Sequence, residues 1–253
     1  MRRTTLSLVP LLLLSACATL PQRTATPAAT SAAQSQQAPY IAPGTLDLAA
    51  LLPPPPAAGS AAERAELDAM LRIQEARTPA QAERAHKDEQ VSIWRFADAL
   101  GNPPAFNAKQ LPVTGAFFAR LQHQTASFSS PAKDVFGRPR PFRTEPRLKP
   151  VVEMPPSASY PSGHSTWAHT MAVVLADMLP EYRAQIFSRA DEYAHNRIVG
   201  GVHYPSDVEA GALGGTAIAA AFLASPHFQA DEAAAAAELR AALGLPPLPR
   251  SRH

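Results

Sequence analysis

The sequence predicts an all-α protein built as a single-domain helical bundle, and three observations support this fold class. Apolar residues recur at helical spacing over long stretches, as Trp167, Met171, Val174 and Leu175 do between residues 162 and 179. No stretch of useful length alternates apolar with polar residues, as a half-buried strand would. Prolines stand just before several of the apolar stretches, at the first helical position, which suits a residue without an N–H group.

The same spacing divides the chain into helices and connections. The basic, proline-rich stretch 131–156 is expected to be a loop. Residues 53–56 are prolines and form a stiff polyproline-like segment. We expect this segment to lie against the folded domain, because Leu48, Leu51 and Leu52 need cover. The expected helices are 61–76, 79–100, 114–128, 162–179, 180–199, 205–224 and 226–243.

The first residues predict an exported protein. Met1-Arg2-Arg3 is basic, residues 6–14 are mostly apolar, and Leu14-Ser15-Ala16-Cys17 resembles the lipobox of bacterial lipoproteins. The apolar run is too short to cross a bilayer as a helix. We expect residues 1–17 to be a signal peptide and Cys17 to be lipidated, with an ordinary signal peptide cut near Ala18 as the alternative. Because Ala18 rather than Asp follows the cysteine, the expected location is the periplasmic side of the cell envelope, tethered to the outer membrane.

Composition limits the partners of the chain. The formal net charge is +2 and no run of Lys and Arg occurs, so no nucleic-acid partner is expected. After the leader no apolar run reaches membrane-spanning length, so membrane contact is expected only through the lipid anchor. Cys17 is the single cysteine, which excludes a disulfide within the mature chain. Residues 18–47 are expected to be a flexible tether, residues 48–245 the folded domain and residues 246–253 a C-terminal tail.

Two clusters of residues indicate anion binding. Lys133 and Arg140 lie in a proline-stiffened basic stretch, where a guanidinium fork and a lysine suit phosphate oxygens. Ser162, Gly163 and His164 open a strongly apolar helix, whose first N–H groups are free to bind an anion. The alternatives are a solvated basic loop for the first cluster and a plain N-cap with an exposed histidine for the second.

A third cluster brings a histidine and a carboxylate to a helix junction. Gly200-Gly201 can end the helix that carries Arg197, and a new helix can begin after His203. Asp207 then lies in the first turn of that helix, where a carboxylate is favoured and can reach back to His203. A carboxylate on one imidazole nitrogen fixes the tautomer and leaves the other nitrogen as a nucleophile or base. Asp207 can also cap its own helix, and the two interpretations are compatible.

Taken together, the three clusters resemble the three-part signature of the PAP2 phosphatase superfamily. The flanking residues look like those of the bacterial class A non-specific acid phosphatases, and the resemblance extends over roughly residues 48–228. The residues that carry it are the Leu52–Pro56 leader, Ala132-Lys133-Asp134, Arg140-Pro141-Phe142, Tyr160-Pro161-Ser162-Gly163-His164, and Arg197 with His203 and Asp207.

The resemblance implies a metal-independent acid phosphatase that hydrolyses phosphate monoesters. It implies that His203 attacks phosphorus to form a phosphohistidine, that Asp207 orients His203, and that His164 acts as general acid and then as base. It implies no cofactor and no metal, and it allows association of several copies of the chain. The phosphate-binding residues implied are Lys133, Arg140, Ser162, Gly163 and Arg197.

The chain departs from the family pattern in places. Asn196 replaces the usual Ser before the arginine, which puts the local geometry in question, and Tyr204-Pro205-Ser206 replaces the usual Trp-Gln-Ser. Characterised members often carry a disulfide, which this chain lacks the cysteines to form. None of these departures removes a catalytic group.

Four other functions stay open at the level of the sequence. A vanadium-dependent haloperoxidase would use the same pocket, with His203 ligating vanadium. An integral-membrane lipid phosphatase would carry the same motifs but needs spanning segments. A non-catalytic, phosphate-binding envelope lipoprotein would have lost activity, for which Asn196 is the only indication. A zinc site made of His195, His203 and Asp207 lacks the spacing of a zinc protease.

Overall fold

The computed structural model describes residues 38–249, and the predictions for the signal peptide, for Cys17 and for residues 18–37 and 250–253 lie outside them. Over the described residues the chain forms helices joined by turns and loops, with no strand. The prediction of an all-α domain is therefore confirmed. No single described helix is long and apolar enough to cross a membrane, and only the pair Pro205–Leu223 and Pro226–Ala242, bent by 94°, passes that test jointly.

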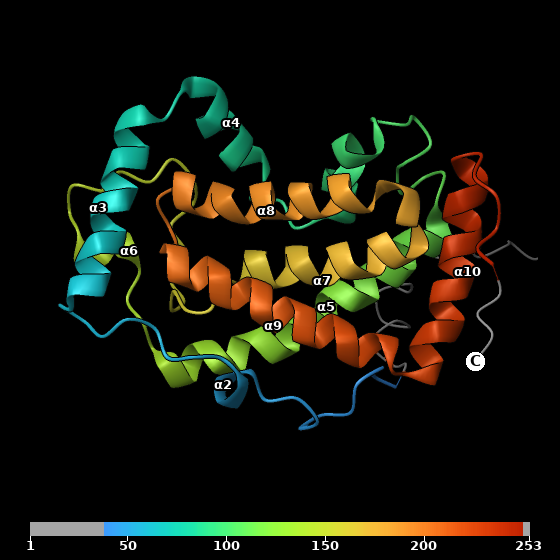
Figure 1. Cartoon of the computed structure of the whole chain (residues 1–253), viewed down its shortest axis with the longest axis horizontal. Helices are drawn as coiled ribbons and strands as arrows, with labels where there is room; N and C mark the ends of the chain where they lie inside the picture. The colour runs from blue at the N-terminus through green and yellow to red at the C-terminus, as the bar shows by residue number, and fades with distance from the viewer. Residues whose placement is uncertain (1–37, 250–253) are drawn as a thin grey trace, which may run out of the picture. The chain divides into compact units, whose positions relative to one another are not determined.

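Three helices form the centre of the fold, and Figure 1 shows α7 (Gly163–Met178) running between α8 (Arg183–Val199) and α9 (Pro205–Leu223). Two glycines of α9 let it approach α7 closely. A Cβ on Gly215 would lie 2.4 Å from the Thr166 carbonyl oxygen, and one on Gly211 would lie 2.7 Å from the Ser162 carbonyl oxygen. The small residues of this helix therefore allow the close packing that its composition predicts.

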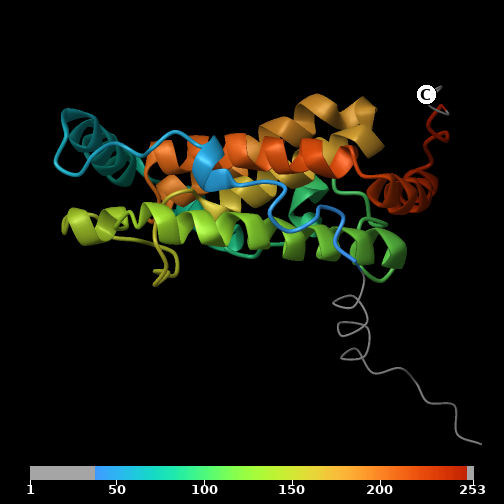
Figure 2. The ribbon, with the colours of Figure 1, turned by 90° about the horizontal axis from the view of Figure 1, so that it is seen from below.

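The remaining helices cover this centre. Figure 2 shows the long α5 running beneath α7 and α9, while α10 follows α9 after a sharp bend. Leu48, the first residue of the short α2, and Leu52, its C-cap, are buried as expected, whereas Leu51 stays 52% exposed. The bounds of these elements are α2 Leu48–Leu51, α3 Ala61–Ala76, α4 Pro79–Lys87, η1 Ile93–Leu100, α5 Pro112–Phe136, α6 Pro141–Thr144, η2 Pro180–Tyr182 and α10 Pro226–Ala242.

Helix α5 extends eight residues beyond its expected end and carries Pro131 in its interior, which corrects the expected loop at 131–156. An interior proline removes one hydrogen bond and costs about 3 kcal/mol in a helix. Tertiary packing offsets this cost, because Ala132 is buried and the Phe136 ring packs edge-on against Tyr160 at 4.8 Å. Lys133 therefore lies in the last turn of a helix.

The expected helix 79–100 is interrupted at Asp88. Helix α4 ends at Lys87 with Asp88 as its C-cap, and η1 begins at Ile93. The side chain of Asp88 is fully buried and accepts hydrogen bonds from Arg95 and Arg189. These bonds, which the local pattern does not indicate, anchor the turn at residues 88–90.

Residues 40 and 41, which fall within the expected flexible tether 18–47, pack against the folded domain instead. Tyr40 and Ile41 are buried in the core. The Tyr40 N–H donates to Gln124 Oε1 at 2.9 Å, and the Tyr40 hydroxyl donates to Asp231 at 2.5 Å. The guanidinium of Arg120 lies 3.6 Å from the centroid of the Tyr40 ring.

Candidate active site

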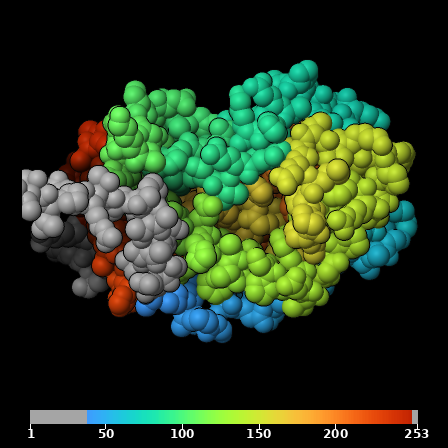
Figure 3. All heavy atoms as spheres, turned by 180° about the vertical axis from the view of Figure 1, so that it is seen from behind, coloured from blue at the N-terminus to red at the C-terminus, as the bar shows by residue number. Residues whose placement is uncertain are grey.

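The three clusters of the sequence meet at one end of the central helices. Lys133 lies in the last turn of α5, Arg140 stands just before α6, and His164 is in the first turn of α7. Arg197 lies in the last turn of α8, and the loop that follows carries His203. Figure 3 shows a hollow on one face, bordered by the teal segment before η1, the green end of α5 and the yellow-green loop near residue 155.

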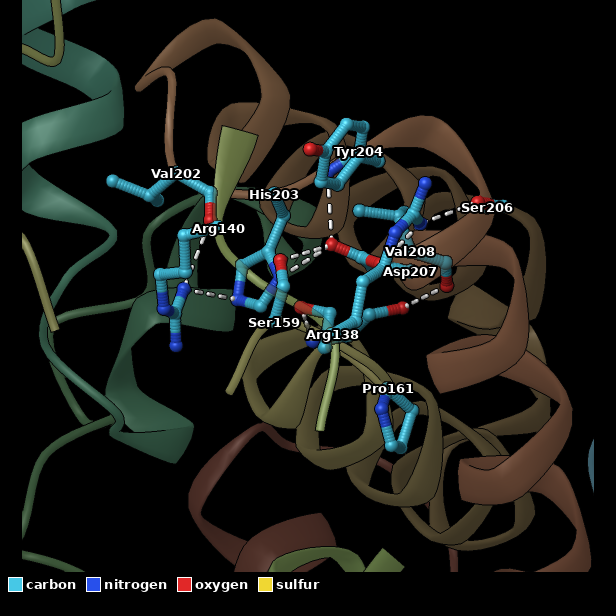
Figure 4. A network of polar contacts seen from close by, with 12 residues as sticks. Arg138, Arg140, Ser159, Pro161, Val202, His203, Tyr204, Ser206, Asp207 and Val208 are labelled. Atoms are coloured by element: carbon cyan, nitrogen blue, oxygen red, sulfur yellow. Dashed lines mark hydrogen bonds and ion pairs between the residues drawn. The ribbon is translucent and has the colours of Figure 1, made fainter. Parts of the chain in front are cut away.

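His203 is held between a carboxylate and a guanidinium, as Figure 4 shows. Its Nδ1 lies 3.2 Å from Asp207 Oδ2, and its Nε2 lies 3.1 Å from Nη1 of Arg140. A guanidinium donates hydrogen bonds but accepts none, so Nε2 must offer its lone pair. The proton of the neutral ring is therefore on Nδ1, where it is donated to Asp207. This tautomer leaves a lone pair on Nε2, which the expected role of His203 as a nucleophile requires.

Asp207 is buried and held by more groups than the sequence indicates. The Ser159 hydroxyl donates to Oδ2, the Tyr204 N–H donates to Oδ2 at 2.9 Å, and Arg138 Nη1 lies 2.7 Å from Oδ1. Burial raises the pKa of Asp207, and the Arg138 ion pair opposes that rise. Because its helix-capping bond and its contact with His203 share one oxygen, both predicted roles of this carboxylate occur together.

Arg138 and Ser159 are site residues that the sequence motifs do not single out. Arg138 pairs with Asp207 and, through Nη2, with Glu66 Oε2 at 2.8 Å, and its guanidinium stacks 3.6 Å from the ring centroid of Tyr204. With carboxylates on both sides, Arg138 has its charge neutralised and serves to hold Asp207. Arg138 lies in the basic stretch between Lys133 and Arg140, but its sequence position does not distinguish it from a phosphate ligand.

Lys133 and Arg140 differ from Arg138 in having no ion pair with any described carboxylate. Nζ of Lys133 donates to the carbonyl oxygens of Ala158 and Pro161 at 3.0 and 2.6 Å. Arg140 donates to the carbonyl oxygens of Ser157 and Val202, each at 2.9 Å. These contacts fix the direction of the two cations while leaving their charges uncompensated.

Arg197 is the third such cation and the most buried of them, with 2% of its surface exposed. Its Nε and Nη1 have no hydrogen-bond partner among the described residues. A buried guanidinium without a partner is costly, so three convergent cations of this kind favour an anion between them. A phosphate group, with several oxygens and up to two negative charges, suits this arrangement.

Burial and the neighbouring positive charges shift the pKa values of several groups in the site. Burial and the charges of Lys133, Arg140 and Arg197 lower the pKa of His203 well below its ordinary value. Burial, followed by the charge of Arg140, lowers the pKa of Lys133 to about 7. Burial and Arg197 lower the pKa of Arg140 to about 10. His203 is therefore neutral even in mild acid.

His164 faces the same group from the start of α7. Its Nε2 lies 3.1 Å from the carbonyl oxygen of Glu89, and its ring stacks on Tyr193 with centroids 6.0 Å apart. A carbonyl only accepts, so Nε2 carries a proton and Nδ1 is the atom left for proton exchange. Burial, then the charges of Arg197, Lys133 and Arg140, lower the pKa of His164 to about 3.

Ser162 and Gly163 form the N-terminus of α7 beside Lys133. The Ser162 hydroxyl accepts from the Ser165 N–H at 3.3 Å, which makes Ser162 the N-cap of the helix. A Cβ on Gly163 would lie 3.8 Å from Cε of Lys133, so the glycine is next to the lysine stem. The first N–H groups of α7 therefore lie on the same side as the cations, where a helix N-terminus favours an anion.

Asn196 points away from the anion group. Its amide Nδ2 donates to Asp88 Oδ2 at 2.8 Å, in the buried cluster behind the site. Asn196 therefore donates a hydrogen bond to a buried carboxylate, and Arg197 next to it still lies at the site.

The zinc hypothesis does not fit the geometry. Among residues 38–249 no three His, Cys, Asp or Glu side chains are grouped to hold a metal ion. Both ring nitrogens of His203 are already engaged, one by Asp207 and one by the cationic Arg140. His195 is exposed on the outer side of α8.

Comparison with known proteins finds a family match over part of this chain. Residues 116–230 match the family described as the PAP2 superfamily. The non-specific acid phosphatase of Providencia stuartii is 28% identical over 193 residues, which cover 73% of this chain and 77% of that protein. That of Salmonella typhimurium is 27% identical over 187 residues, which cover 70% of this chain and 74% of that protein.

A solved structure shares the fold. A bacterial vanadium-dependent iodoperoxidase superposes with a TM-score of 0.56 at 21% identity, over 70% of this chain and 52% of that chain. The present chain thus spans about half the length of the iodoperoxidase, and at this identity the likeness concerns the fold alone. The chain contains a PAP2 superfamily domain and is homologous to the bacterial non-specific acid phosphatases.

Proposed function

We propose that this protein is a metal-independent phosphatase that hydrolyses phosphate monoesters through a phosphohistidine at Nε2 of His203. The observation that carries the proposal is a set of three cations around a neutral histidine that contacts Asp207. These cations, Lys133, Arg140 and Arg197, have no carboxylate partner among residues 38–249. The homology to acid phosphatases supports the same reaction class.

In the first step, the Nε2 lone pair of His203 attacks phosphorus. The P–O bond to the alcohol breaks, and its electron pair goes to the leaving oxygen, which takes a proton from Nδ1 of His164. Asp207 stabilises the positive charge that develops on the His203 ring. Arg140 Nη1, now 3.1 Å from Nε2, moves its hydrogen bond to a phosphate oxygen as the P–N bond forms.

In the second step, His164 takes a proton from a water molecule. The water oxygen attacks phosphorus, the P–N bond breaks, and its electron pair returns to Nε2 of His203. His164 is then protonated again and ready for the next substrate, so one residue serves as acid and then as base.

The cations supply the electrostatic part of catalysis. Charge on a transferring phosphoryl group collects on its equatorial oxygens, and positioned donors stabilise it without reorganising. Lys133, Arg140 and Arg197 would take this role with the N–H groups at the start of α7. These groups perform the charge neutralisation that metal ions provide in other phosphatases.

The two histidines have opposite requirements, which predict a bell-shaped pH profile with an acid optimum. His203 must be neutral, and burial with its neighbouring cations lowers its pKa well below the ordinary value. His164 must be protonated, and its low pKa of about 3 is raised when a phosphate dianion offsets the charges of Arg197, Lys133 and Arg140.

An assay with a chromogenic phosphate ester tests the proposal. We expect wild-type turnover that survives EDTA, is inhibited by vanadate and disappears in His203→Ala. His195→Ala is the matched control, because His195 is exposed on the neighbouring helix and was the candidate zinc ligand. Loss of activity on EDTA treatment, or an active His203→Ala variant, would contradict the mechanism.

The haloperoxidase alternative has a separate outcome in the same experiment. After loading with vanadate, a haloperoxidase would oxidise halide in the presence of hydrogen peroxide and would show no ester hydrolysis. Phosphatase turnover by the vanadate-free protein, with no halide oxidation after loading, excludes it.

We propose further that Cys17 carries a lipid and holds the enzyme on the periplasmic side of the outer membrane. The support is the sequence Leu14-Ser15-Ala16-Cys17 after an apolar run. Metabolic labelling with a fatty acid is expected to mark the wild type and to miss Cys17→Ser. Labelling of both proteins, or of neither, would contradict this location.

A further inference from the structure

Three consecutive residues after α4 bind the helices of the site. Asp88 accepts hydrogen bonds from α8 through its carboxylate, Glu89 accepts from His164 through its carbonyl oxygen, and Gln90 accepts from the Tyr193 hydroxyl through its carbonyl oxygen at 2.8 Å. This segment, residues 88–90, contacts the first turn of α7 and three positions of α8.

Asp88 is the fixed point of the segment, with none of its surface exposed. Its Oδ1 lies 2.6 Å from Arg189 Nη2 and 2.7 Å from Arg95 Nη2, and its Oδ2 accepts from Asn196 Nδ2 at 2.8 Å. Burial raises the pKa of Asp88, but the hydrogen bonds from Arg189, Arg95 and Asn196 outweigh it and keep the pKa below its ordinary value. The carboxylate is therefore ionised, and each oxygen has a partner.

The next two residues hold His164 by its edge and by its face. The Glu89 carbonyl oxygen accepts a hydrogen bond from Nε2–H of His164 at 3.1 Å. Tyr193, whose hydroxyl bonds Gln90, stacks on the imidazole with 24° between the rings. Only Nδ1 then remains for a proton to the leaving group. The direction of Nδ1 depends on where the segment 88–90 places its carbonyl groups.

We propose that Asn196 is a positioning residue for His164: by bonding Asp88 it fixes the Glu89 carbonyl, and through it the direction of Nδ1. This inference rests on the proposed phosphatase function. Asn196 directly precedes Arg197, so one hydrogen bond sets the proton donor relative to the phosphate-binding guanidinium. The alternative is a purely structural role, in which Asn196 only donates a hydrogen bond to the buried Asp88 carboxylate and affects stability but not catalysis.

Leaving-group dependence separates the two roles. A nitrophenolate leaves without a proton, whereas an alkoxide needs one, and a positioned general acid contributes about 10²–10⁴ in rate. We therefore expect Asn196→Ala to lower kcat/KM, which reports the first step and not the shared second step, about tenfold more for an alkyl phosphate than for p-nitrophenyl phosphate, a small part of that contribution. Asn196→Ser, which keeps a donor, is expected to restore most of the difference.

A second variant keeps the test decisive if Asn196→Ala does not fold. Tyr193→Phe removes only the hydroxyl that anchors the ring on Gln90, and no buried charge loses a partner. Since one hydrogen bond is typically worth about a fivefold change in an equilibrium, we expect a selective loss of up to about fivefold on the alkyl ester.

Thr114→Val is the matched control. The Thr114 hydroxyl is buried and bonds Glu238 Oε2 at 2.7 Å, in the same helix as Lys133 but about 28 Å along it. This variant should lose stability with no preference between the two esters.

Two results overturn the inference, and they are distinguishable. If the wild type is active and the variants lose the same factor on both esters, Asn196 is structural only and the phosphatase function stands. If the wild type hydrolyses neither ester, the proposed function is wrong, and the role of Asn196 falls with it.

Discussion

At the scale of single residues, the surroundings of each charged side chain decide its role. Arg138 and Arg140 are two positions apart, yet Arg138 is neutralised by Asp207 and Glu66, whereas Arg140 has no described carboxylate partner. The first therefore supports the histidine–carboxylate pair, and the second is available for an anion. Residue type alone does not make this distinction, because both are arginines in one basic stretch.

Ser159 offers the sharpest residue-scale prediction. Its hydroxyl donates to Asp207 and its oxygen lies 3.4 Å from His203 Nδ1, so it helps hold the pair that presents Nε2. We expect Ser159→Ala to reduce kcat about tenfold to a hundredfold with little change in KM, since it removes a hydrogen bond to a buried charge worth about 1.5–3 kcal/mol. Steady-state kinetics on an aryl phosphate measure the effect.

The control for Ser159 is Ser129, a buried serine outside the site, on α5. Ser129 is buried and donates only to its own helix, at 3.4 Å from the Ala126 carbonyl oxygen. Ser129→Ala should keep wild-type kinetics. An equal loss in both variants, or a loss in Ser159→Ala that lies entirely in KM, would contradict the positioning of Asp207 by Ser159.

The charged groups of the site can be predicted from the sequence, but the hydrogen bonds that orient them cannot. Lys133, Arg140, Arg197, His203 and Asp207 were predicted from their clusters and from the family resemblance, and the structure brings them together. Ser159 and the Glu89 carbonyl were not predicted, because a lone serine and a main-chain oxygen carry no sequence pattern. Their contacts join segments 44 and 75 residues apart in the chain.

At the scale of elements, local pattern predicts helices well where packing agrees with it. The helix 61–76 has the predicted bounds, whereas α5 runs through Pro131 to Phe136 against its local signal. The difference is tertiary: Ala132 and Phe136 are held by neighbouring elements. Helix propensity is a weak prior that such packing overrides.

The close contact between α7 and α9 gives an element-scale prediction. At Gly215 a Cβ would lie 2.4 Å from the Thr166 carbonyl oxygen, which is backbone and must shift with its whole helix. We expect Gly215→Ala to destabilise the protein by about 1–3 kcal/mol, the usual cost of overpacking. Urea denaturation followed by circular dichroism measures it.

The neighbouring glycine is the control for this prediction. A Cβ on Gly214 would meet only the ends of two leucine side chains, Leu48 at 3.3 Å and Leu52 at 3.9 Å, which can rotate away. Because alanine is favoured over glycine inside a helix by up to about 1 kcal/mol, Gly214→Ala should be neutral or stabilising. If both variants lose the same stability, the close approach of α9 to α7 is not what Gly215 provides.

At the scale of the whole molecule, the fold gathers positive charge from four separate segments. Lys133, Arg140, His164 and Arg197 come from α5, the loop before α6, α7 and α8, and each lowers the pKa of at least one other site group. The spacing of the motifs along the chain does not determine how far apart these segments lie in space. Their convergence is therefore predicted by the family resemblance and not by the residues alone. These groups repel one another electrostatically, which lowers their pKa values. A bound anion relieves the repulsion, so anion binding and proton binding depend on each other.

This coupling predicts how anion affinity depends on pH. Burial, then Arg140, lower the pKa of Lys133 to about 7, so the lysine gains its charge as the pH falls through that value. Sulfate stays a dianion over the whole range, so only the protein titrates. We expect sulfate to bind more tightly at lower pH, by at most about tenfold per pH unit for one coupled proton, in calorimetric titrations between about pH 6 and pH 8.

Lys133→Arg isolates the group responsible, because a guanidinium keeps its charge throughout this range. In that variant the affinity for sulfate should change much less between about pH 6 and pH 8, while remaining close to the wild-type affinity at the acid end. An unchanged slope in Lys133→Arg would assign the proton to another group, with His164 the next candidate because the same cations lower its pKa. An affinity that rose with pH would contradict the placement of Lys133 beside the anion, since deprotonation removes a positive charge and can only weaken the attraction.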